Sequence, residues 1–222
     1  DATDYETNFD VNDGWVSSDT AKLDVASGAL QIYTTTGSYP LNSIYKDLTG
    51  SVITGDFLIH YKASYSQMGS QGLGIQWHGL TDEGEGGDDS QDALMIMIYD
   101  DNNNFNSAAM NDQAPEASSN QGALSPQINP TATDYYIELI RDGSDWITNV
   151  YEDPEHDTLL GTRTITDNSA TELRYFTVQT YTTGDNIGYI DDFKFWDGVT
   201  SCDPCSTVTA PSQATRVGVE LD

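Results

Sequence analysis

Apolar and polar residues alternate along most of this chain, in short segments bounded by Gly, Asn, Asp or Ser. Alternation with a period of two is typical of strands that bury one face, whereas the apolar face of a helix recurs about every 3.6 residues. The alternating segments are residues 30–33, 57–61, 73–77, 94–99, 135–140, 146–151, 175–181 and 189–195. Because no long stretch has the helical period, the pattern predicts an all-β protein, an antiparallel jelly roll or β-sandwich.

Two connections between these segments add detail. Residues 141–145 read Arg-Asp-Gly-Ser-Asp and predict a tight hairpin, in which Gly143 takes a positive φ. Residues 102–133 are rich in Asn, Ala, Ser, Gln and Pro and have little apolar content. We therefore expect a long surface excursion there, and such loops are often functional.

The end of the chain has a different composition. Thr, Ser, Pro and Ala predominate in residues 199–222, so we expect one domain over residues 1–198 followed by a linker or tail. The tail holds Cys202 and Cys205, which we interpret as a local or interchain disulfide because no second CxxC or His pair completes a zinc site. Alternation at 217–221 favours one more strand, which starts a following domain, returns to this domain or pairs with a neighbouring copy.

The charge balance limits the partners. The 222 residues include 8 Lys+Arg and 36 Asp+Glu, a formal net charge of −28. This field repels nucleic acids, anionic membranes and polyanionic substrates. No apolar run approaches the roughly 20 residues of a membrane-spanning helix, and the chain begins at Asp1 without Met. We therefore expect an extracellular protein, secreted, on the cell surface or on a virion, whose partners are neutral glycans, cations or copies of itself.

Two groups of segments carry a resemblance to a known family. The first group is Asn8-Phe-Asp10, Gly14-Trp15, 22–25 and 27–31, and the second is 135–143, 173–178 and 189–197. They are similar to the first and the last strands of the concanavalin A-like lectin/glucanase superfamily, in particular of the laminin-G-like jelly-roll modules of secreted and surface proteins. The resemblance implies two curved antiparallel sheets with a concave face, frequent glycan binding and frequent structural calcium.

Enzymes of related fold provide two tests for catalysis. Members that hydrolyse β-glucans carry an E-x-D-x-E strand, which points three carboxylates into the groove. That pattern is absent here, and glycines interrupt the acidic residues of 82–89. Three other segments are similar to motifs of jelly-roll alginate lyases, with His78 and Tyr65 as the catalytic pair, but in a different order along the chain. These segments are Gln76-Trp-His78, residues 61–67 and Glu172-Leu-Arg174. We therefore favour a non-catalytic role.

Aromatic residues near the ends of expected strands are candidates for stacking on a sugar. The candidate glycan-binding residues are Trp77, His78 and Tyr99. The alternatives are that Trp77 packs in the core and that His78 makes a single hydrogen bond at the end of a strand. His60 and His156 have no partner at the spacing of metal ligands, so the sequence does not predict a transition-metal site.

Acidic residues gather where strands are expected to end. Calcium takes six to eight oxygen ligands, and closely spaced carboxylates with free backbone carbonyls between them provide such a set. The candidate calcium ligands are Asp82, Glu83, Glu85, Asp88, Asp89, Asp100 and Asp101. A further candidate is Asp10 with Asp191 or Asp192, a location that resembles the calcium site of many related modules. We favour the acidic loops, because carbonyls in strands are already hydrogen-bonded.

These observations lead to one main hypothesis and two alternatives. The main hypothesis is a non-catalytic carbohydrate-binding or adhesion module that is stabilised by calcium. The alternatives are a structural subunit of an extracellular filament, surface layer or virion, and a polysaccharide-degrading enzyme, either a glucanase or a lyase.

Overall fold

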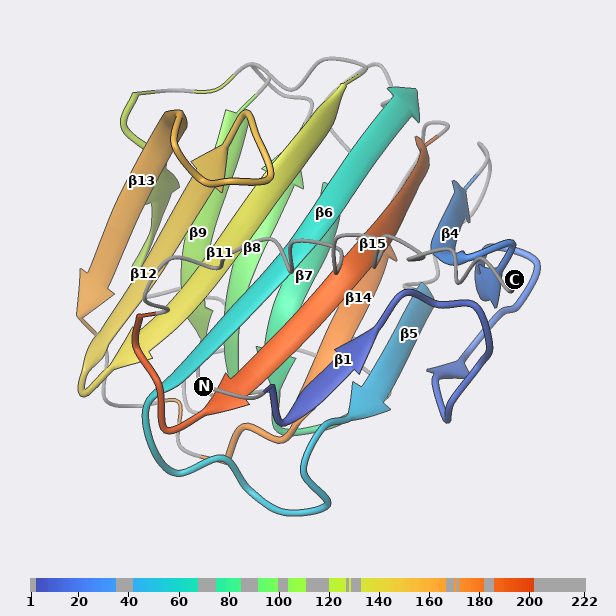
Figure 1. The fold of residues 1–222 in the computed structure, drawn as a ribbon, viewed down its shortest axis with the longest axis horizontal. Helices are drawn as coiled ribbons and strands as arrows, with labels where there is room; N and C mark the ends of the chain where they lie inside the picture. The colour runs from blue at the N-terminus through green and yellow to red at the C-terminus, as the bar shows by residue number, and fades with distance from the viewer. Residues whose placement is uncertain are drawn as a thin grey trace, which may run out of the picture.

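The computed structural model describes residues 3–34, 42–67, 75–84, 92–99, 104–110, 120–126, 128, 133–166, 170, 172–181 and 186–201. Within this part of the chain the regular elements are all β-strands, arranged in two antiparallel sheets (Figure 1). The all-β prediction is therefore confirmed. The described residues include no helix long and apolar enough to cross a membrane. Cys202, Cys205 and the strand expected at 217–221 lie outside the described residues.

Sheet A, which faces the viewer in Figure 1, brings the two ends of the domain together. Its spatial order is β13 (Leu159–Thr166), β12 (Asp145–Tyr151), β11 (Asp134–Asp142), β6 (Phe57–Gln67), β15 (Asn186–Asp197), β4 (Ala29–Thr34) and β3 (Leu23–Ala26). In addition, β1 (Tyr5–Thr7) pairs with β15, with Tyr5 opposite Phe195. The first and last described strands are thus neighbours in one sheet.

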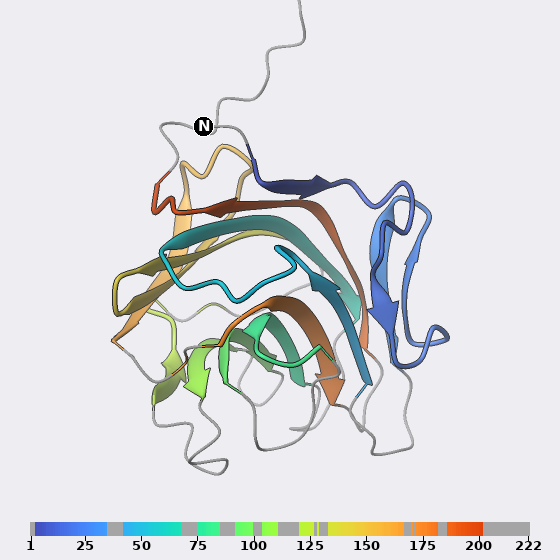
Figure 2. The same ribbon diagram turned by 90° about the horizontal axis from the view of Figure 1, so that it is seen from below.

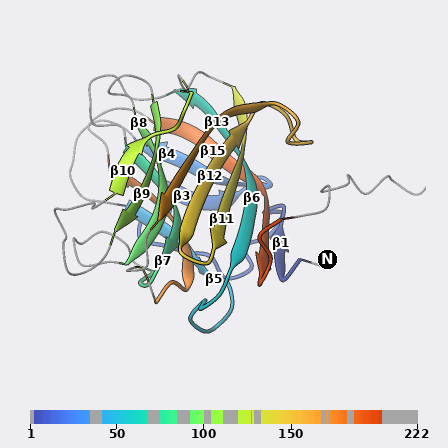
Figure 3. The ribbon, with the colours of Figure 1, turned by 90° about the vertical axis from the view of Figure 1, so that its left-hand side faces the viewer.

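Sheet B lies behind sheet A. Its spatial order is β10 (Asn120–Ala123), β9 (Asn104–Met110), β8 (Ala93–Tyr99), β7 (Ile75–Thr81), β14 (Tyr175–Tyr181), β5 (Asn42–Asp47) and β2 (Val16–Ser17). Both sheets bend in the same direction, as the views in Figures 2 and 3 show. The outer face of sheet A is therefore convex, and the outer face of sheet B is concave.

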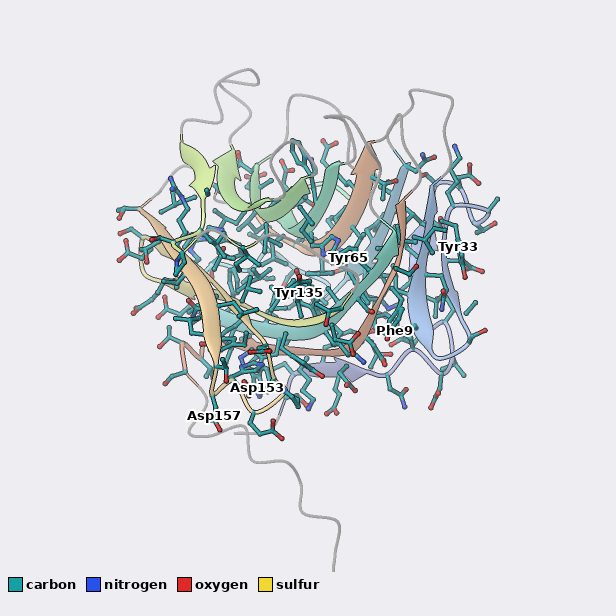
Figure 4. The ribbon with its side chains drawn as sticks, turned by 90° about the horizontal axis from the view of Figure 1, so that it is seen from above. Phe9, Tyr33, Tyr65, Tyr135, Asp153 and Asp157 are labelled. Carbon is teal, nitrogen blue, oxygen red and sulfur yellow. The ribbon has the colours of Figure 1, made fainter. Side chains whose placement is uncertain are left out.

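The core lies between the two sheets because alternate residues of each strand point inward. Along β12 half-buried and fully buried residues alternate without exception. Tyr65 and Tyr135 meet in this interior, with ring centroids 6.5 Å apart (Figure 4). At the other end Trp15 packs edge-on against Phe176 of sheet B and Phe193 of sheet A. Trp15 thus joins the two layers at this end, whereas Tyr65 and Tyr135 belong to neighbouring strands of sheet A.

All eight segments that were expected from alternation form or overlap strands, and Gly143 takes a φ of 59° in the β11–β12 hairpin. The interpretation of 102–133 as a surface excursion was wrong, because β9 and β10 within it form the edge of sheet B. The sequence pattern was misleading there because β9 reads Asn-Phe-Asn-Ser-Ala-Ala-Met, in which the two large apolar residues are five positions apart with small and polar ones between them. Edge strands need fewer apolar residues than central strands.

Candidate functional site

The concave outer face of sheet B is built from strands far apart in the sequence. Strand β14 pairs with both β5 and β7, so Gln179 lies beside Ser43 on one side and Trp77 on the other. One step along the sheet, the hydroxyls of Thr81 and Thr177 are 2.7 Å apart and share a hydrogen bond. These hydroxyl and amide side chains are at most 2% exposed, so they form a buried polar layer beneath this face.

An aromatic pair stands at one end of the same face. The rings of Tyr45 and Tyr175 meet edge to face with centroids 5.6 Å apart, and both side chains are half-buried. The Arg174 guanidinium lies 5.1 Å from the centroid of the Tyr175 ring and donates hydrogen bonds to Asp47, the shorter of 2.5 Å. The ion pair lowers the pKa of Asp47, so this carboxyl is ionised at neutral pH. Half-exposed rings beside oriented polar groups are the usual components of a sugar-binding surface.

Two carboxylates lie where β7 ends and β8 begins. The Asp82 amide donates to the Asp92 carbonyl at 3.1 Å, which holds the two residues side by side. Asp92 is buried, and one carboxylate oxygen of Asp82, Oδ1, is buried without a hydrogen-bond partner. Burial raises the pKa of Asp82, and the charges of Asp92 and Glu83 raise it further. Asp82, Glu83 and Asp92 therefore concentrate negative charge at this position.

Trp77 and His78 point to opposite faces of sheet B, as adjacent residues in a strand must. Trp77 is on the concave outer face, half-buried, with an indole N–H that is buried and unpaired. His78 is completely buried between the sheets, and its Nδ1 lies 3.4 Å from the Tyr61 hydroxyl. His78 is therefore out of reach of a ligand on the outer face, contrary to its selection as a glycan-binding residue. The side chain of Tyr99 is outside the described part of the structure.

Both residues of the lyase-like pair are inaccessible to a polysaccharide. Tyr65 is 1% exposed and His78 is 0% exposed, and both lie in the interior. Complete burial lowers the pKa of His78 to about 3 and raises the pKa of Tyr65 well above its ordinary value. Neither group can meet a substrate or exchange a proton with one near neutral pH.

The acidic candidates fall partly within the described residues. Asp82 and Glu83 are the members that the structure describes, whereas Glu85, Asp88, Asp89, Asp100 and Asp101 lie outside it. The further calcium candidate combines Asp191 and Asp192 of β15 with Asp10, which lies in the segment after β1. The Asp192 amide donates to Asp191 Oδ1 at 2.9 Å, and burial raises the pKa of Asp191, with the charges of Asp192 and Asp10 acting in the same direction.

Sequence reasoning missed a cluster on the convex outer face of sheet A. His60 Nε2 lies 2.9 Å from Glu138 Oε1, and His156 Nδ1 lies 4.0 Å from the same oxygen. The conclusion that these histidines have no partner at the spacing of metal ligands was wrong, because it considered spacing along the chain alone. His60 and Glu138 are 78 positions apart in sequence but directly opposite each other on β6 and β11.

Solved structures of similar fold include lectins, a carbohydrate-binding module and a protein linked to glycan cleavage. The CBM2 module of the evolved Dit protein of Lactobacillus casei BL23 phage J-1 is 14% identical, with a TM-score of 0.60, and 90% of this chain and 97% of that chain are covered. The exoplasmic/lumenal domain of VIP36, bound to Ca²⁺ and mannose, is 12% identical with a TM-score of 0.60, covering 85% and 84%. A structure described with endo-acting O-glycanases of the human gut microbiota is 10% identical with a TM-score of 0.62, covering 88% and 99%.

These similarities establish the fold. The chain has the two-sheet architecture of the lectin-like β-sandwiches, which the resemblance to the concanavalin A-like superfamily predicted. No protein-family model and no curated protein sequence matches the chain. Because lectins and proteins associated with glycan cleavage both occur at this level of similarity, the function must be argued from the residues themselves.

Proposed function

We propose that this protein is a non-catalytic carbohydrate-binding module of an extracellular protein, and that it takes a neutral glycan on the concave outer face of sheet B. The observation that carries the proposal is the half-buried pair of Tyr45 and Tyr175, which lies at the edge of a layer of buried hydroxyl and amide groups. The net charge of −28 favours a neutral glycan over a polyanionic one. The lectins and the carbohydrate-binding module among the structural neighbours support the same class of ligand.

A binding role is favoured over hydrolysis by the side chains that point outward from the central strands. Glycosidases use two carboxyl groups about 5–10 Å apart on either side of the scissile bond. In the described parts of β7, β8 and β14 the residues facing outward are Trp77, Gly79, Thr81, Ala93, Met95, Tyr175, Thr177 and Gln179. None of these eight residues is acidic, so this part of the face supplies no acid and base of that kind.

The glycan proposal predicts a specific effect of removing one ring. Tyr175→Ala should weaken binding of a neutral oligosaccharide at least about fivefold, since an aromatic platform contributes about 1 kcal/mol or more. Isothermal titration with neutral glycans selected on a glycan array measures the change. Tyr33→Ala is the matched control, because Tyr33 is an exposed tyrosine on the other sheet and should leave affinity unchanged (Figure 4). Failure of the wild-type protein to bind any neutral glycan, or equal losses in both variants, would exclude this surface.

The acidic residues at the end of β7 and the start of β8 fit a calcium ion. The unpartnered buried oxygen of Asp82 and the neighbouring Asp92 supply hard oxygen donors in a place where negative charges gather. We infer that Asp82 and Asp92 hold the ion, with Glu83 adjacent, as part of the acidic loop that the sequence suggested. A cation there would neutralise charge at the rim of the proposed glycan surface.

Calcium is therefore expected to stabilise the fold. At a calcium concentration about 100 times the dissociation constant, the thermal midpoint should rise by about 5–10 °C over the value in EDTA at equal ionic strength. Asp82→Asn should abolish most of this rise, whereas Asp142→Asn, an exposed residue of the β11–β12 hairpin, should preserve it. Differential scanning calorimetry measures all three proteins. An unchanged midpoint in the wild type, or an equal rise produced by monovalent salt alone, would contradict the prediction.

A further inference from the structure

A row of polar side chains crosses the convex face of sheet A, on the opposite side of the molecule from the proposed glycan surface. In register across β6, β11, β12 and β13 the row consists of His60, Glu138, Asn149 and Thr162. The Thr162 hydroxyl donates to Asn149 Oδ1 at 2.6 Å, and Asn149 Nδ2 donates to Glu138 Oε2 at 2.6 Å. The Tyr151 hydroxyl also donates to Glu138 Oε2, at 3.3 Å. One carboxylate oxygen is thus fixed by the sheet, and the other, Oε1, faces the histidines.

The second histidine comes from the loop between β12 and β13, which folds over this row. Asp153 holds the loop by accepting hydrogen bonds from the amides of Asp157 and Thr158, at 3.0 and 2.8 Å. Figure 4 shows Asp153 and Asp157 on the outer side of sheet A. His156 has a φ of 59°, a left-handed conformation that costs energy in a residue other than glycine. Its ring stacks on Tyr151 with an interplanar angle of 5° and a centroid distance of 4.6 Å.

We propose that His60, Glu138 and His156 form a binding site for a divalent transition-metal ion of the zinc type. The donor atoms of the three side chains all lie within 4.8 Å of one another. Among the described residues, this is the group of three His, Cys, Asp or Glu side chains close enough to share a metal ion. Tetrahedral zinc has ligands at about 2.0–2.2 Å, which places the donor atoms about 3.3–3.6 Å apart. The observed separations of 2.9 and 4.0 Å bracket that spacing. Small movements of the two rings therefore suffice to admit the ion.

The donor set determines which ions the site prefers. Two imidazole nitrogens and one carboxylate oxygen suit zinc, cobalt, nickel or copper, whereas calcium requires six or more oxygens. The side chains of His60, Glu138 and His156 are 9%, 14% and 17% exposed, so the site is sheltered but open to solvent on one side. The Trp196 ring packs edge-on against His60 with a centroid distance of 5.1 Å. Three protein ligands leave a fourth position for water, and the ion ties the β12–β13 loop to β6 and β11.

The experiment uses the full chain with Cys202 and Cys205 replaced by Ser, so that thiolates cannot bind the metal. Zinc chloride is titrated calorimetrically near pH 7 in millimolar calcium chloride, which saturates carboxylate sites that prefer hard cations. We expect one-to-one binding and, at zinc about 100 times the dissociation constant, a rise of about 5–10 °C in the thermal midpoint. Cobalt(II) should show the visible absorption of a four-coordinate ion.

Three variants distinguish a specific metal-binding site from the general attraction of cations to an acidic protein. His156→Gln and Glu138→Gln should each reduce zinc affinity at least about 100-fold, because even residues beyond the ligands change affinity 10- to 100-fold. Glu155→Gln is the matched control, since it removes one charge from the exposed neighbour of His156 and no ligand. Midpoints in EDTA establish that each variant is folded. Unchanged zinc binding in His156→Gln, or an equal loss in Glu155→Gln, would overturn the proposal.

Discussion

Trp15→Ala is expected to lower the free energy of unfolding by about 3–5 kcal/mol, a large part of the about 5–15 kcal/mol typical of a domain. Trp15 is 4% exposed and contacts Phe9, with ring centroids 5.3 Å apart, as well as one ring from each sheet. Its indole N–H donates to the Tyr5 hydroxyl at 3.2 Å. Truncation therefore leaves a cavity between the sheets and frees the N-terminal segment from the core.

Urea denaturation followed by far-UV circular dichroism measures this loss without relying on tryptophan fluorescence. Val11→Ala is the control, because Val11 lies in the same segment with 70% of its surface exposed and should change stability by less than about 0.5 kcal/mol. A loss below about 1 kcal/mol for Trp15→Ala would show that the segment before β2 does not share the core. Equal losses in both variants would place the effect in the unfolded state instead.

The strands that alternation identified are those whose composition reflects burial on one side. Along β11 and β12 nearly every second residue is large, apolar and inward-facing, and the pattern is legible without a structure. Strands β5, β9, β10 and β13 are rich in Asn, Ser, Thr or Ala, and sequence reasoning missed them. All four belong to the last two positions at a sheet edge, where neighbours on one side are few and propensity is a weak signal.

The candidate sites show more clearly what a local sequence pattern can and cannot predict. Trp77 and His78 could not both line one surface, since neighbouring residues of a strand face opposite ways. That contradiction was available from the sequence. In contrast, nothing local links His60 with Glu138, because their contact depends on β6 and β11 being adjacent and in one particular register. Metal ligands contributed by different strands become visible only once the order of the strands is known.

His78 should make the protein lose stability as the pH falls from 7 to 5. Complete burial lowers the pKa of His78 to about 3, whereas the unfolded chain takes up a proton near 6.5. Below about 6.5 the unfolded state therefore binds a proton that the folded state excludes, and each pH unit costs about 1.4 kcal/mol. Stability is fully present above 6.5 and falls by about 2 kcal/mol by pH 5.

His78→Gln removes the titrating group at this position, so its stability should change by about 2 kcal/mol less over the same interval, whatever its stability at pH 7. Burial also lowers the pKa of His156, which acts in the same direction, and His156→Gln measures that part separately. Urea unfolding at pH 7, 6 and 5 avoids the range below about 4, where hydrogen-bonded carboxylates such as Asp47 become protonated. Identical pH dependence in wild type and His78→Gln would mean that His78 reaches solvent. Since His78 and Trp77 are consecutive, that result would also require β7 to present its faces the other way and would remove Trp77 from the proposed glycan surface.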